Sequence, residues 1–578
     1  MNLETKNLKA ILTKLFEFNK TGFESQLTSK QKVILGVSSG KERARTFSGA
    51  GNTIDSAYYA ARSKLLKHVK EAELSVKWIY AAFIVSETNM QIEEFYSELR
   101  EEKVNYYRHG IALDENYQFA FLEQELNGAG LIDYKSDNGP VLHNHNITQF
   151  LRYQKKIDAK IKFEHEKIKK VIRFNTKSSF YDGETDECFN LYDKGWVKGI
   201  RVIEKLNEEQ LRELTRLNGE YLKSTVKDDG RFIYGVFPVF DREIEAYNLV
   251  RHILSVIALI NLYQLTDDES YVPAIDSTYN WVMENLKETR SGALVLVDFD
   301  NENEIRLGAL GLALVMICVY ADVFKGHEDL DKAVLIGKAI MDMQNEDGSF
   351  AHVLNWPDME IKDAFRIVYY SGEACYGLMK LYALTKDEGI LNAVKKAFDF
   401  FIDNNYEEYY DHWLSYATNE LTKYEDDDRL LTFGMRNATI KIDFIIDRLT
   451  SWPTFMELLN AACGTIDNIK KAGKEDVLKE FPMDDFWNAV SVRLFRQLNG
   501  IYFPELAMFY RNPEKIKYGV FIRHHSFRIR DDDIAHHIIG YYNFIENVLP
   551  TYPGKTINRI WIGGELSLME PDMESARH

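Results

Sequence analysis

Apolar residues recur at helical spacing from Asn207 to Pro550, and this regularity constrains the fold more than any other feature of the sequence. About twelve helices are expected in this stretch, and pairs of them recur at intervals of about 50 to 60 residues. Twelve helices arranged as six hairpins can close into two concentric rings. The sequence therefore predicts an α/α toroid over the C-terminal two-thirds of the 578-residue chain.

Many of the expected helices begin at a residue that caps helix N-termini well, with acidic residues following in the first turn. The expected starts are Asn207, Arg242, Asp268, Arg306, Asp329, Ala364, Asp387, Asp411, Leu430, Pro453, Met483 and Asp533. If alternate helices face the axis, the inner ones start near Arg242, Arg306, Ala364, Asp411, Pro453 and Asp533. Their N-termini then meet at one rim, where the helix dipoles favour an anionic or polyhydroxyl ligand.

Residues 1–200 have a mixed character that predicts an α+β domain. Strands are expected at 32–36 and 78–87, and a helix at 53–74. Further helices are expected at 119–131 and 149–171, the second a lysine-rich connector. The predicted organisation is an α+β N-terminal domain with a helical connector over 1–200, then a mainly α (α/α)6 toroid over 201–578, with β structure confined to the first 200 residues.

The sequence Ser-Gly-Ala-Gly-Asn at 48–52 precedes one of these predicted helices and could bind phosphate there. It lacks the Lys-Ser/Thr of a P-loop and the third glycine of a dinucleotide fingerprint. A tight turn is therefore the favoured interpretation.

The formal net charge of −18 argues against nucleic acid as a partner, because phosphate neutralisation needs an excess of Lys and Arg. Four widely spaced cysteines, Cys188, Cys318, Cys375 and Cys463, predict reduced buried thiols and no zinc or disulfide framework. The N-terminus lacks the features of a secretory signal, and the most apolar run, Leu307–Val319, is too short to span a membrane. We expect a cytoplasmic protein without membrane insertion.

Several segments resemble the six-hairpin toroids of sugar-active enzymes. Met343–Phe350 (MQNEDGSF) is similar to their Q-x-x-D-G-S-F/W turn, Tyr370–Phe401 to an inner-helix, turn, outer-helix hairpin, and Leu262–Asp267 (LYQLTD) to the corner of such a hairpin. That group includes glycoside hydrolases, unsaturated-uronate hydrolases, alginate and heparinase-type lyases, and acylglucosamine epimerases. The resemblance implies the toroid and a sugar substrate, but no motif fixes the reaction. At the turn, we expect Gly348 in a backbone conformation that resists a Cβ atom and Phe350 packed inward.

The predicted rim carries dense polar and aromatic sequence, and we place the candidate site there. The candidate catalytic residues are Glu373, Asp411, His412, His252 and Asp531. The candidate substrate-binding residues are Arg306, Arg366, Tyr247, Tyr370, Trp413 and Tyr416. No metal and no cofactor is predicted.

His412, Tyr416 and Glu420 share one face of a predicted helix, and such a set can transfer protons while Trp413 stacks on a sugar ring. The alternative is that Asp411 simply caps an amphipathic helix. Asn248, Arg251 and His252 also share one face. With Tyr247 they match the residue types that uronate lyases of toroid type use to neutralise a carboxylate and abstract the adjacent proton, although their order is not diagnostic. The alternative is a structural hydrogen-bonded network.

Two acidic features leave similar alternatives. Asp531–Asp533 with His536 and His537 could bind a metal, but helix capping plus one rim carboxylate is the favoured interpretation. Glu373 could pair with Asp411 or Asp241 for glycoside hydrolysis, which needs two carboxylates at a defined separation. Otherwise it is a buried glutamate tied to an arginine.

The leading hypothesis is a carbohydrate-active enzyme that takes an oligosaccharide or glycoconjugate into the toroid cleft, most simply as a glycoside hydrolase. The first alternative is a lyase or epimerase acting through His and Tyr. The second is a non-catalytic toroid that binds glycan or protein.

Overall fold

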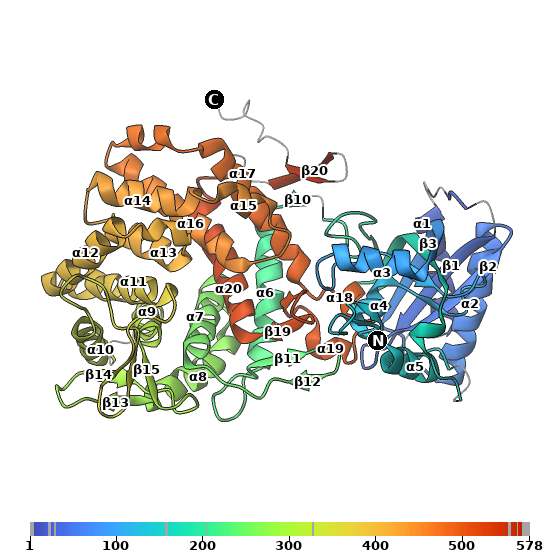
Figure 1. The fold of residues 1–578 in the computed structure, drawn as a ribbon, viewed down its shortest axis with the longest axis horizontal. Helices are drawn as coiled ribbons and strands as arrows, with labels where there is room; N and C mark the ends of the chain where they lie inside the picture. The colour runs from blue at the N-terminus through green and yellow to red at the C-terminus, as the bar shows by residue number, and fades with distance from the viewer. Residues whose placement is uncertain are drawn as a thin grey trace.

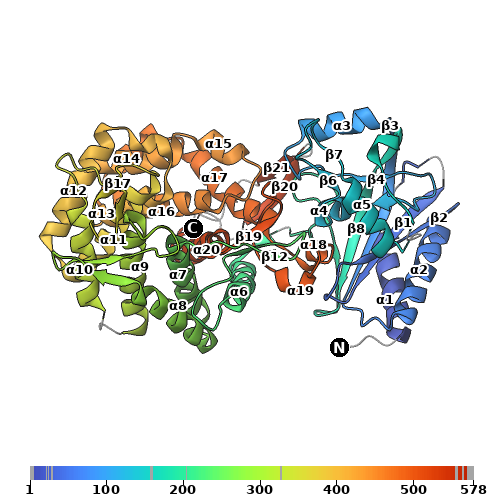
Figure 2. The ribbon, with the colours of Figure 1, turned by 60° about the horizontal axis from the view of Figure 1, so that its bottom comes forward.

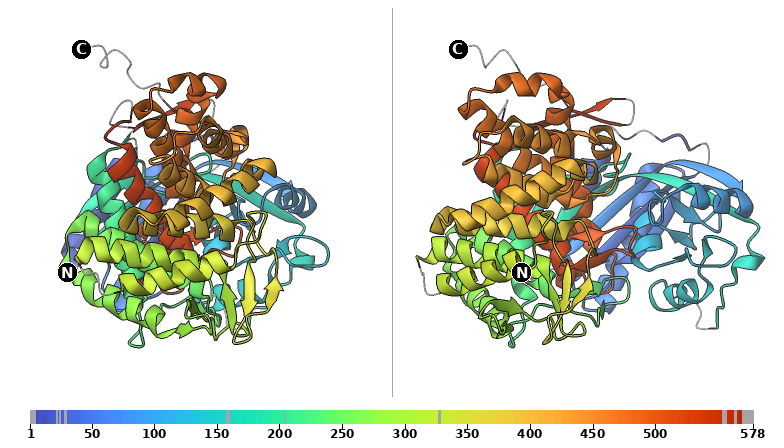
Figure 3. Two further views of the ribbon diagram at one scale, coloured as in Figure 1. Left: turned by 90° about the vertical axis from the view of Figure 1, so that its left-hand side faces the viewer. Right: turned by 60° about the vertical axis from the view of Figure 1, so that its left-hand side comes forward.

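The computed structural model describes residues 5–20, 23, 25–27, 30–156, 160–203, 205–325, 329–552, 557–562 and 565–568. A sheet built from the first 190 residues lies beside a large assembly of helices (Figure 1). The two views in Figure 3 show the sheet and the helices as adjoining bodies.

The N-terminal sheet has seven strands, and all of its pairings are antiparallel. The order is β2 (Arg45–Gly51), β1 (Gln31–Ser38), β3 (Trp78–Gln91), β8 (Lys170–Asp182), β4 (Gly110–Ala112) and β5 (Ala120–Phe121), with β9 (Glu187–Asn190) on β8. Helices α1 (Thr5–Lys20) and α2 (Ile54–Glu71) cover one face. On the other face, Tyr80 and Ile84 pack with Met508 and Phe509, which follow α18 (Pro504–Ala507) of the helical region. The sheet and the helical region therefore share buried core.

Two local predictions for this region are wrong. Residues 48–51 belong to β2 and are not a turn; a Cβ atom on Gly49 would lie 2.1 Å from the backbone oxygen of Ala57, so the glycine lets α2 approach the strand closely. The lysine-rich segment is not one helix either, because α5 (Asn144–Tyr153) ends early and β8 begins at Lys170. Phe163 lies outside any helix or strand and is buried in the core of this region, so tertiary burial overrode a local helical pattern.

The first 190 residues also hold α3 (Ile92–Glu101), α4 (Glu123–Gly128) and the small hairpin of β6 (Ile132–Asp133) and β7 (Val141–Leu142). Helix α4 is shorter than the predicted helix over 119–131, because Ala120 and Phe121 pair as β5.

Six inner helices form a closed ring, which confirms the predicted toroid. They are α7 (Leu249–Thr266), α9 (Leu307–Phe324), α11 (Tyr369–Thr385), α13 (His412–Leu421), α16 (Pro453–Lys471) and α20 (Asp531–Asn543). Each packs against the next, and α20 packs back against α7 (Figure 2). The outer helices are α6 (Glu208–Ser224), α8 (Val272–Glu284), α10 (Leu330–Asp342), α12 (Glu388–Asp403), α14 (Asp428–Thr439) and α17 (Met483–Arg496). The shorter α15 (Ile442–Asp447) packs on α17, and α19 (Pro513–Ile516) on α18.

Where the predicted first residue caps the helix with its side chain, the observed helix begins at the next residue. Asn207, Asp387 and Asp411 each accept a hydrogen bond from a backbone N–H of the first turn. Two inner starts were predicted too early. Helix α7 begins at Leu249 because Arg242 lies in β12 (Arg242–Glu243), and α11 begins at Tyr369 because β17 (Ile361–Asp363) precedes it.

Short strands also occur outside the first 200 residues, contrary to the prediction. They are β10 (Lys205–Leu206), β11 (Gly235–Phe237), β12, β13 (Leu286–Glu288), β14 (Leu294–Leu296), β15 (Glu304–Arg306), β16 (Val353–Asn355), β17, β18 (Phe521–Ile522), β19 (Arg528–Arg530), β20 (Ile557–Ile562) and β21 (Glu565–Leu568). β15 leads directly into α9, and β19 leads directly into α20. β15 and β19 therefore fix where two of the inner helices begin.

The predicted turn at 343–350 is confirmed. Gly348 has φ +96°, and a Cβ atom there would lie 2.4 Å from the backbone oxygen of Lys396. Phe350 is buried, as expected. The turn therefore requires glycine for both its backbone conformation and its contact with α12.

Helices α7 and α9 are long and apolar enough to cross a membrane by composition alone. In each, 72% of the apolar window is buried inside the protein. Both are inner helices of the ring, so their composition reflects burial on all sides. All four cysteines are unpaired, and Cys188 is only half-buried.

Candidate active site

A cavity of about 360 Å³ lies where the inner helices begin. Five of its lining residues, Arg251, Tyr370, His412, Pro453 and Asp532, come from the first turns of five different inner helices. Loop residues, including Trp452 and His524, complete its wall. The predicted rim therefore holds a concave site assembled from segments far apart in the sequence.

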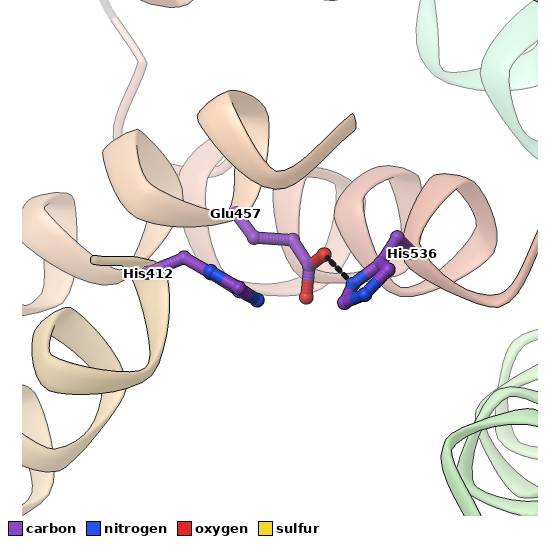
Figure 4. A group of neighbouring side chains, drawn as sticks. All are labelled: His412, Glu457 and His536. Carbon is purple, nitrogen blue, oxygen red and sulfur yellow. Dashed lines mark hydrogen bonds and ion pairs between the residues drawn. The ribbon is translucent and has the colours of Figure 1, made fainter. Parts of the chain in front are cut away.

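Three side chains from three inner helices converge (Figure 4), and two of them, His412 and His536, line the cavity. His412 comes from α13, Glu457 from α16 and His536 from α20, and one ligand atom of each lies within 4.8 Å of the others. The His412 and His536 rings have centroids 5.2 Å apart. Two imidazoles thus meet beside one carboxylate.

Glu457 is fully buried and orients His536. Its Oε1 lies 2.6 Å from Nδ1 of His536, and its Oε2 accepts a hydrogen bond of 3.0 Å from the Tyr416 hydroxyl. Asn543 in turn donates to that hydroxyl at 2.8 Å. Burial alone would lower the pKa of His536, but the Glu457 carboxylate outweighs it and raises the pKa above the usual value. The carboxylate therefore favours the imidazolium form of His536.

His412 is the first residue of α13 and is buried at the cavity wall. Its Nε2 has no hydrogen-bond partner within the described structure, and its ring points towards Glu457 (Figure 4). Its Nδ1 lies 3.4 Å from Oδ1 of Asp411. This histidine has one ring nitrogen uncommitted at the cavity.

Asp411 itself is fully buried and caps α13. Its two carboxylate oxygens accept hydrogen bonds from the backbone N–H groups of Trp413 and Leu414, at 3.0 and 3.3 Å. It is not among the residues that line the cavity. The structure therefore places it in the capping role and not at the reacting centre.

Glu373 does line the cavity, on α11. Its Oε2 lacks a partner among the described residues. Burial, and secondarily the Asp411 carboxylate, raise its pKa well above the usual range. These effects favour the protonated form of Glu373, and no ion pair of this residue with an arginine occurs in the described part of the chain, so it is not the arginine-bound glutamate that the sequence also allowed.

Asp532 and Asp533 line the cavity in an ion-paired network at the start of α20, whereas Asp531 does not line it. Asp532 pairs with Arg251 and Arg530, and Asp533 pairs with Arg528. Asp531 is buried, its Oδ1 accepts from the Asp532 backbone, and burial followed by Asp532 raises its pKa well above the usual range.

His252 and Tyr247 lie outside the cavity in an aromatic cluster in which His252 is fully buried. Nδ1 of His252 lies 2.6 Å from the Tyr247 hydroxyl, and Nε2 lies 2.9 Å from the Thr278 carbonyl oxygen. The ring packs against Trp281 at 4.4 Å. Burial lowers the pKa of His252 to about 3, so this histidine is neutral and fully satisfied.

Arg306 and Arg366 also lie outside the cavity. Both pair with Glu304, at 2.8 and 2.7 Å, and Arg306 also pairs with Asp298 at 3.0 Å. Hydrogen bonds from Arg366 and its neighbours hold the pKa of Glu304 well below the usual range. These arginines tie the β15–β16–β17 sheet to the start of α9.

Among the remaining predicted residues, Tyr370 and Trp413 line the cavity and offer aromatic faces. Tyr416 does not line the cavity, and its hydroxyl donates a hydrogen bond to Glu457. Glu420 instead pairs with Lys380 and Lys423, and Asp241 with Lys515.

The sequence analysis did not find Glu457. A signal was present, because Glu373 and Glu457 are each the fifth residue of an inner helix. Polar residues at that position point towards the axis just below the rim. His536, considered only as a metal ligand, is the sixth residue of α20.

Two imidazoles and a carboxylate also form a ligand set that a divalent metal such as zinc accepts. Both oxygens of Glu457 are engaged, one with His536 and one with Tyr416. A metal would have to replace the first of these contacts.

No protein-family model and no curated protein matches this sequence. Among solved structures, a cellobiose 2-epimerase from Bacillus thermoamylovorans is similar at 13% identity over 59% of this chain and 100% of that chain, with a TM-score of 0.44. A D-mannose isomerase has 11% identity over 59% and 97% of the two chains, with a TM-score of 0.44. An α-1,6-mannanase from Salegentibacter has 13% identity over 58% and 100%, with a TM-score of 0.31. Sugar-active enzymes are thus what this chain is similar to, and the functional argument rests on the geometry of the site.

Proposed function

We propose that this protein is an enzyme that moves a proton at the carbon next to the carbonyl group of a reducing sugar, as a sugar epimerase or isomerase does. The observation that carries the proposal is the pair of imidazoles, His412 and His536, at the axial cavity. His536 pairs with a buried carboxylate that raises its pKa, and His412 presents a nitrogen that has no hydrogen-bond partner among the described residues. An acid and a base at one site are what such a reaction needs.

In this scheme His412 is the base and His536 is the acid. His412 Nε2 removes the proton from the carbon next to the carbonyl of the open-chain sugar, and the electron pair forms an enediol or enediolate. His536 supplies a proton to the intermediate. Return of a proton to the opposite face gives the epimer, and return to the neighbouring carbon gives the aldose–ketose isomer. Glu457 orients the His536 ring and stabilises its charge.

Glycoside hydrolysis, the leading hypothesis from sequence, has weaker support at this cavity. It needs one protonated and one ionised carboxyl group flanking the sugar. Glu373 can supply the protonated group. Asp411 is committed to the α13 cap, and Asp532 and Asp533 are engaged in ion pairs with arginines, so none of the three offers an uncommitted carboxylate to the sugar.

A sugar substrate fits the lining of the cavity. Tyr369, Tyr370, Trp413 and Trp452 supply aromatic faces that can stack on a pyranose ring. Asn248, Thr454 and the neutral Glu373 supply groups that can exchange hydrogen bonds with sugar hydroxyls. The resemblance of the turn and hairpin sequences to sugar-active toroids points the same way.

The test is to incubate the purified protein with mannose, glucose and cellobiose in deuterium oxide and to follow the proton at carbon 2 by NMR. Exchange of this proton, with formation of an epimer or ketose, is the expected result. Release of new reducing ends from oligosaccharides without any exchange would contradict the proposal and favour a hydrolase. An ultraviolet-absorbing unsaturated product would favour a lyase.

The ligand atoms within 4.8 Å favour one second candidate, a metal-dependent hydrolase using His412, Glu457 and His536. Metal analysis of the purified protein separates the two. Stoichiometric zinc that is lost in His536→Asn, together with hydrolysis that a chelator abolishes, would replace the first proposal by this one.

A further inference from the structure

A second cavity, of about 410 Å³, lies at the other end of the toroid axis. All six inner helices line it with residues from their C-terminal halves, whereas first turns of inner helices line the axial cavity. One lining residue from each inner helix, in chain order, is Asn261, Val319, Lys380, Glu420, Asn468 and Tyr542. Trp413 lines both cavities and therefore forms part of the wall between them.

Stacked aromatic rings form part of the wall of the second cavity. Tyr376 packs against Tyr416 with ring centroids 5.1 Å apart and an interplanar angle of 24°. It also packs against Trp413, with centroids 6.1 Å apart. The Tyr376 hydroxyl has no hydrogen-bond partner within the described structure. The wall thus offers aromatic surface and one uncommitted hydroxyl, a combination that suits a sugar ring.

Side-chain amides are the commonest polar groups in the lining of the second cavity. They belong to Asn261, Gln264, Asn419, Asn460, Asn468, Asn543 and Asn547. An amide both donates and accepts hydrogen bonds, and so does each hydroxyl of a sugar or polyol. The hydrogen-bonding groups of this cavity therefore match those of a polyhydroxyl molecule.

Two of these amides are buried without a full set of partners. Asn261 is only 6% exposed, and its side chain has no hydrogen-bond partner in the described part of the chain. Asn460 is 4% exposed; its Nδ2 donates to the Gly540 carbonyl oxygen at 2.8 Å, but its Oδ1 has no partner among the described residues. Because buried polar groups normally have partners and cost stability without them, these amides point to a ligand in the cavity.

The charged side chains of the second cavity are balanced in number. Three lysines and three acidic residues line it, namely Lys380, Lys423, Lys471, Asp322, Glu420 and Asp467. Glu420 pairs with Lys380 at 3.4 Å and with Lys423 at 2.8 Å. Since neither sign is in excess, the lining favours a neutral ligand over an ionic one.

From these observations we infer that the second cavity binds a neutral polyhydroxyl molecule of monosaccharide size, either a sugar ring or an open-chain polyol. Its volume lies within the range of about 300–1,000 Å³ that is typical of small-molecule sites. The buried amides exchange hydrogen bonds with the hydroxyl groups, and Trp413 and Tyr376 contact the carbon skeleton. This site is separate from the proposed chemistry, because His412 and His536 line the axial cavity and not this one.

The experiment is calorimetric titration of the full-length protein with methyl glucoside and mannitol, and with glucuronate and glucosamine as charged analogues. Methyl glucoside has no carbonyl form, so the proposed proton transfer cannot consume it. At least one neutral probe is expected to bind more tightly than both charged analogues, with a Kd that high salt leaves unchanged. Failure of both neutral probes to bind, or tighter binding of a charged analogue, would overturn the inference.

The variant Asn261→Leu replaces the unpartnered amide by an apolar side chain of similar size. It should raise the Kd of the neutral probe by about tenfold, because one or two hydrogen bonds to the ligand are lost. The melting temperature should stay the same or rise, since no bond within the protein is removed. Asn468→Leu is the matched structural counterpart and should lower the melting temperature, because Asn468 donates to Asn419 and Thr422. An equal fall in both variants would give Asn261 a structural role and contradict the inference.

Two further variants locate the bound probe. Val319→Trp narrows the second cavity at a half-buried position, and should weaken binding by about tenfold even if Asn261→Leu does not fold. Trp452→Ala changes only the axial cavity and should leave the Kd of this site unchanged. If Trp452→Ala abolishes binding while the other two variants do not, the probe occupies the axial cavity and the inference fails. Because the probe is not turned over, this outcome does not depend on the proposed proton transfer.

Discussion

Two histidine clusters at the inner helices of the toroid contain similar residue types but differ in their hydrogen bonding and in their access to a cavity. The first joins His252 to Tyr247 and Trp281, and the second joins His412 and His536 to Glu457. Both include a tyrosine hydroxyl, since Tyr416 bonds to Glu457. From residue types alone, either could serve acid–base chemistry.

The two clusters differ in whether the histidine nitrogens have hydrogen-bond partners and in whether the histidines line a cavity. Both ring nitrogens of His252 have partners, and burial keeps that ring neutral. In the second cluster a carboxylate raises the pKa of His536, and His412, which lines a cavity, has a ring nitrogen without a partner among the described residues. A histidine becomes a candidate for chemistry when the fold leaves one nitrogen uncommitted beside space for a substrate, and not because of its sequence neighbours.

The largest effect that would test this contrast is expected for His412→Asn and His536→Asn. Each should lower the rate of proton exchange by about 10³-fold, because general acid–base groups contribute about 10²–10⁴-fold. The melting temperature should change little. Exchange rates are measured by NMR on common substrates, and retention of near-normal exchange in both variants would place the chemistry elsewhere.

The next largest expected effect is on stability and concerns the cluster around His252. His252→Asn should destabilise the protein by about 2–3 kcal/mol, because it removes packing against Trp281 and leaves buried partners unsatisfied. Exchange per folded molecule should stay near the normal rate. Denaturant unfolding and single-point exchange assays measure the two quantities. A stable variant without activity would mean that His252 belongs to the active site after all.

Glu457→Gln should have a smaller effect and a distinctive pH signature. The carboxylate raises the pKa of His536, so the acid form persists to higher pH in the native protein and is lost as pH rises through that pKa. Without it, the basic limb of the rate profile should move to lower pH, with roughly tenfold lower activity at neutral pH. An unshifted basic limb would show that His536 is not the titrating acid.

The same substitution has a linked effect on stability. The raised pKa of His536 stabilises the native protein below the unfolded pKa of about 6.5, and this contribution is lost as pH rises through the native value. Stability measured against pH should therefore flatten near neutrality in Glu457→Gln. His252→Asn should instead reduce the loss of stability below about pH 6.5, because His252, whose native pKa is about 3, binds a proton near that pH only in the unfolded state.

The smallest expected effects come from a matched pair of tyrosines. Tyr247→Phe removes the hydroxyl that accepts from the Phe232 backbone and contacts His252, and should cost about 1 kcal/mol of stability without changing activity. Tyr416→Phe removes the hydroxyl that donates a hydrogen bond to Glu457. The less solvated Glu457 carboxylate should raise the pKa of His536 further. The basic limb of the pH–rate profile should therefore move to higher pH, opposite to its shift in Glu457→Gln. If Tyr247→Phe and Tyr416→Phe had the same pH–rate profile, Tyr416 would not be part of the active site.

The sequence alone determined the repeating helical architecture and several of its local details. Periodicity predicted the ring, the caps at Asn207, Asp387 and Asp411 predicted where helices begin, and Gly348 predicted a turn with positive φ. These features are set by interactions within a few residues, so a single sequence reveals them. The location of the site at the rim followed from the same regularity.

Only the tertiary structure decided which polar residues meet there. His412, Glu457 and His536 come together because three inner helices turn particular faces to the axis, and rim strands such as β15 and β19 set where neighbouring helices begin. If one of these helices were rotated by half a turn about its own axis, its histidine would face away from the cavity, as His252 does. Helical spacing shows which residues share a face, but the direction of that face depends on packing against the other helices of the ring, and that packing is a property of the whole chain.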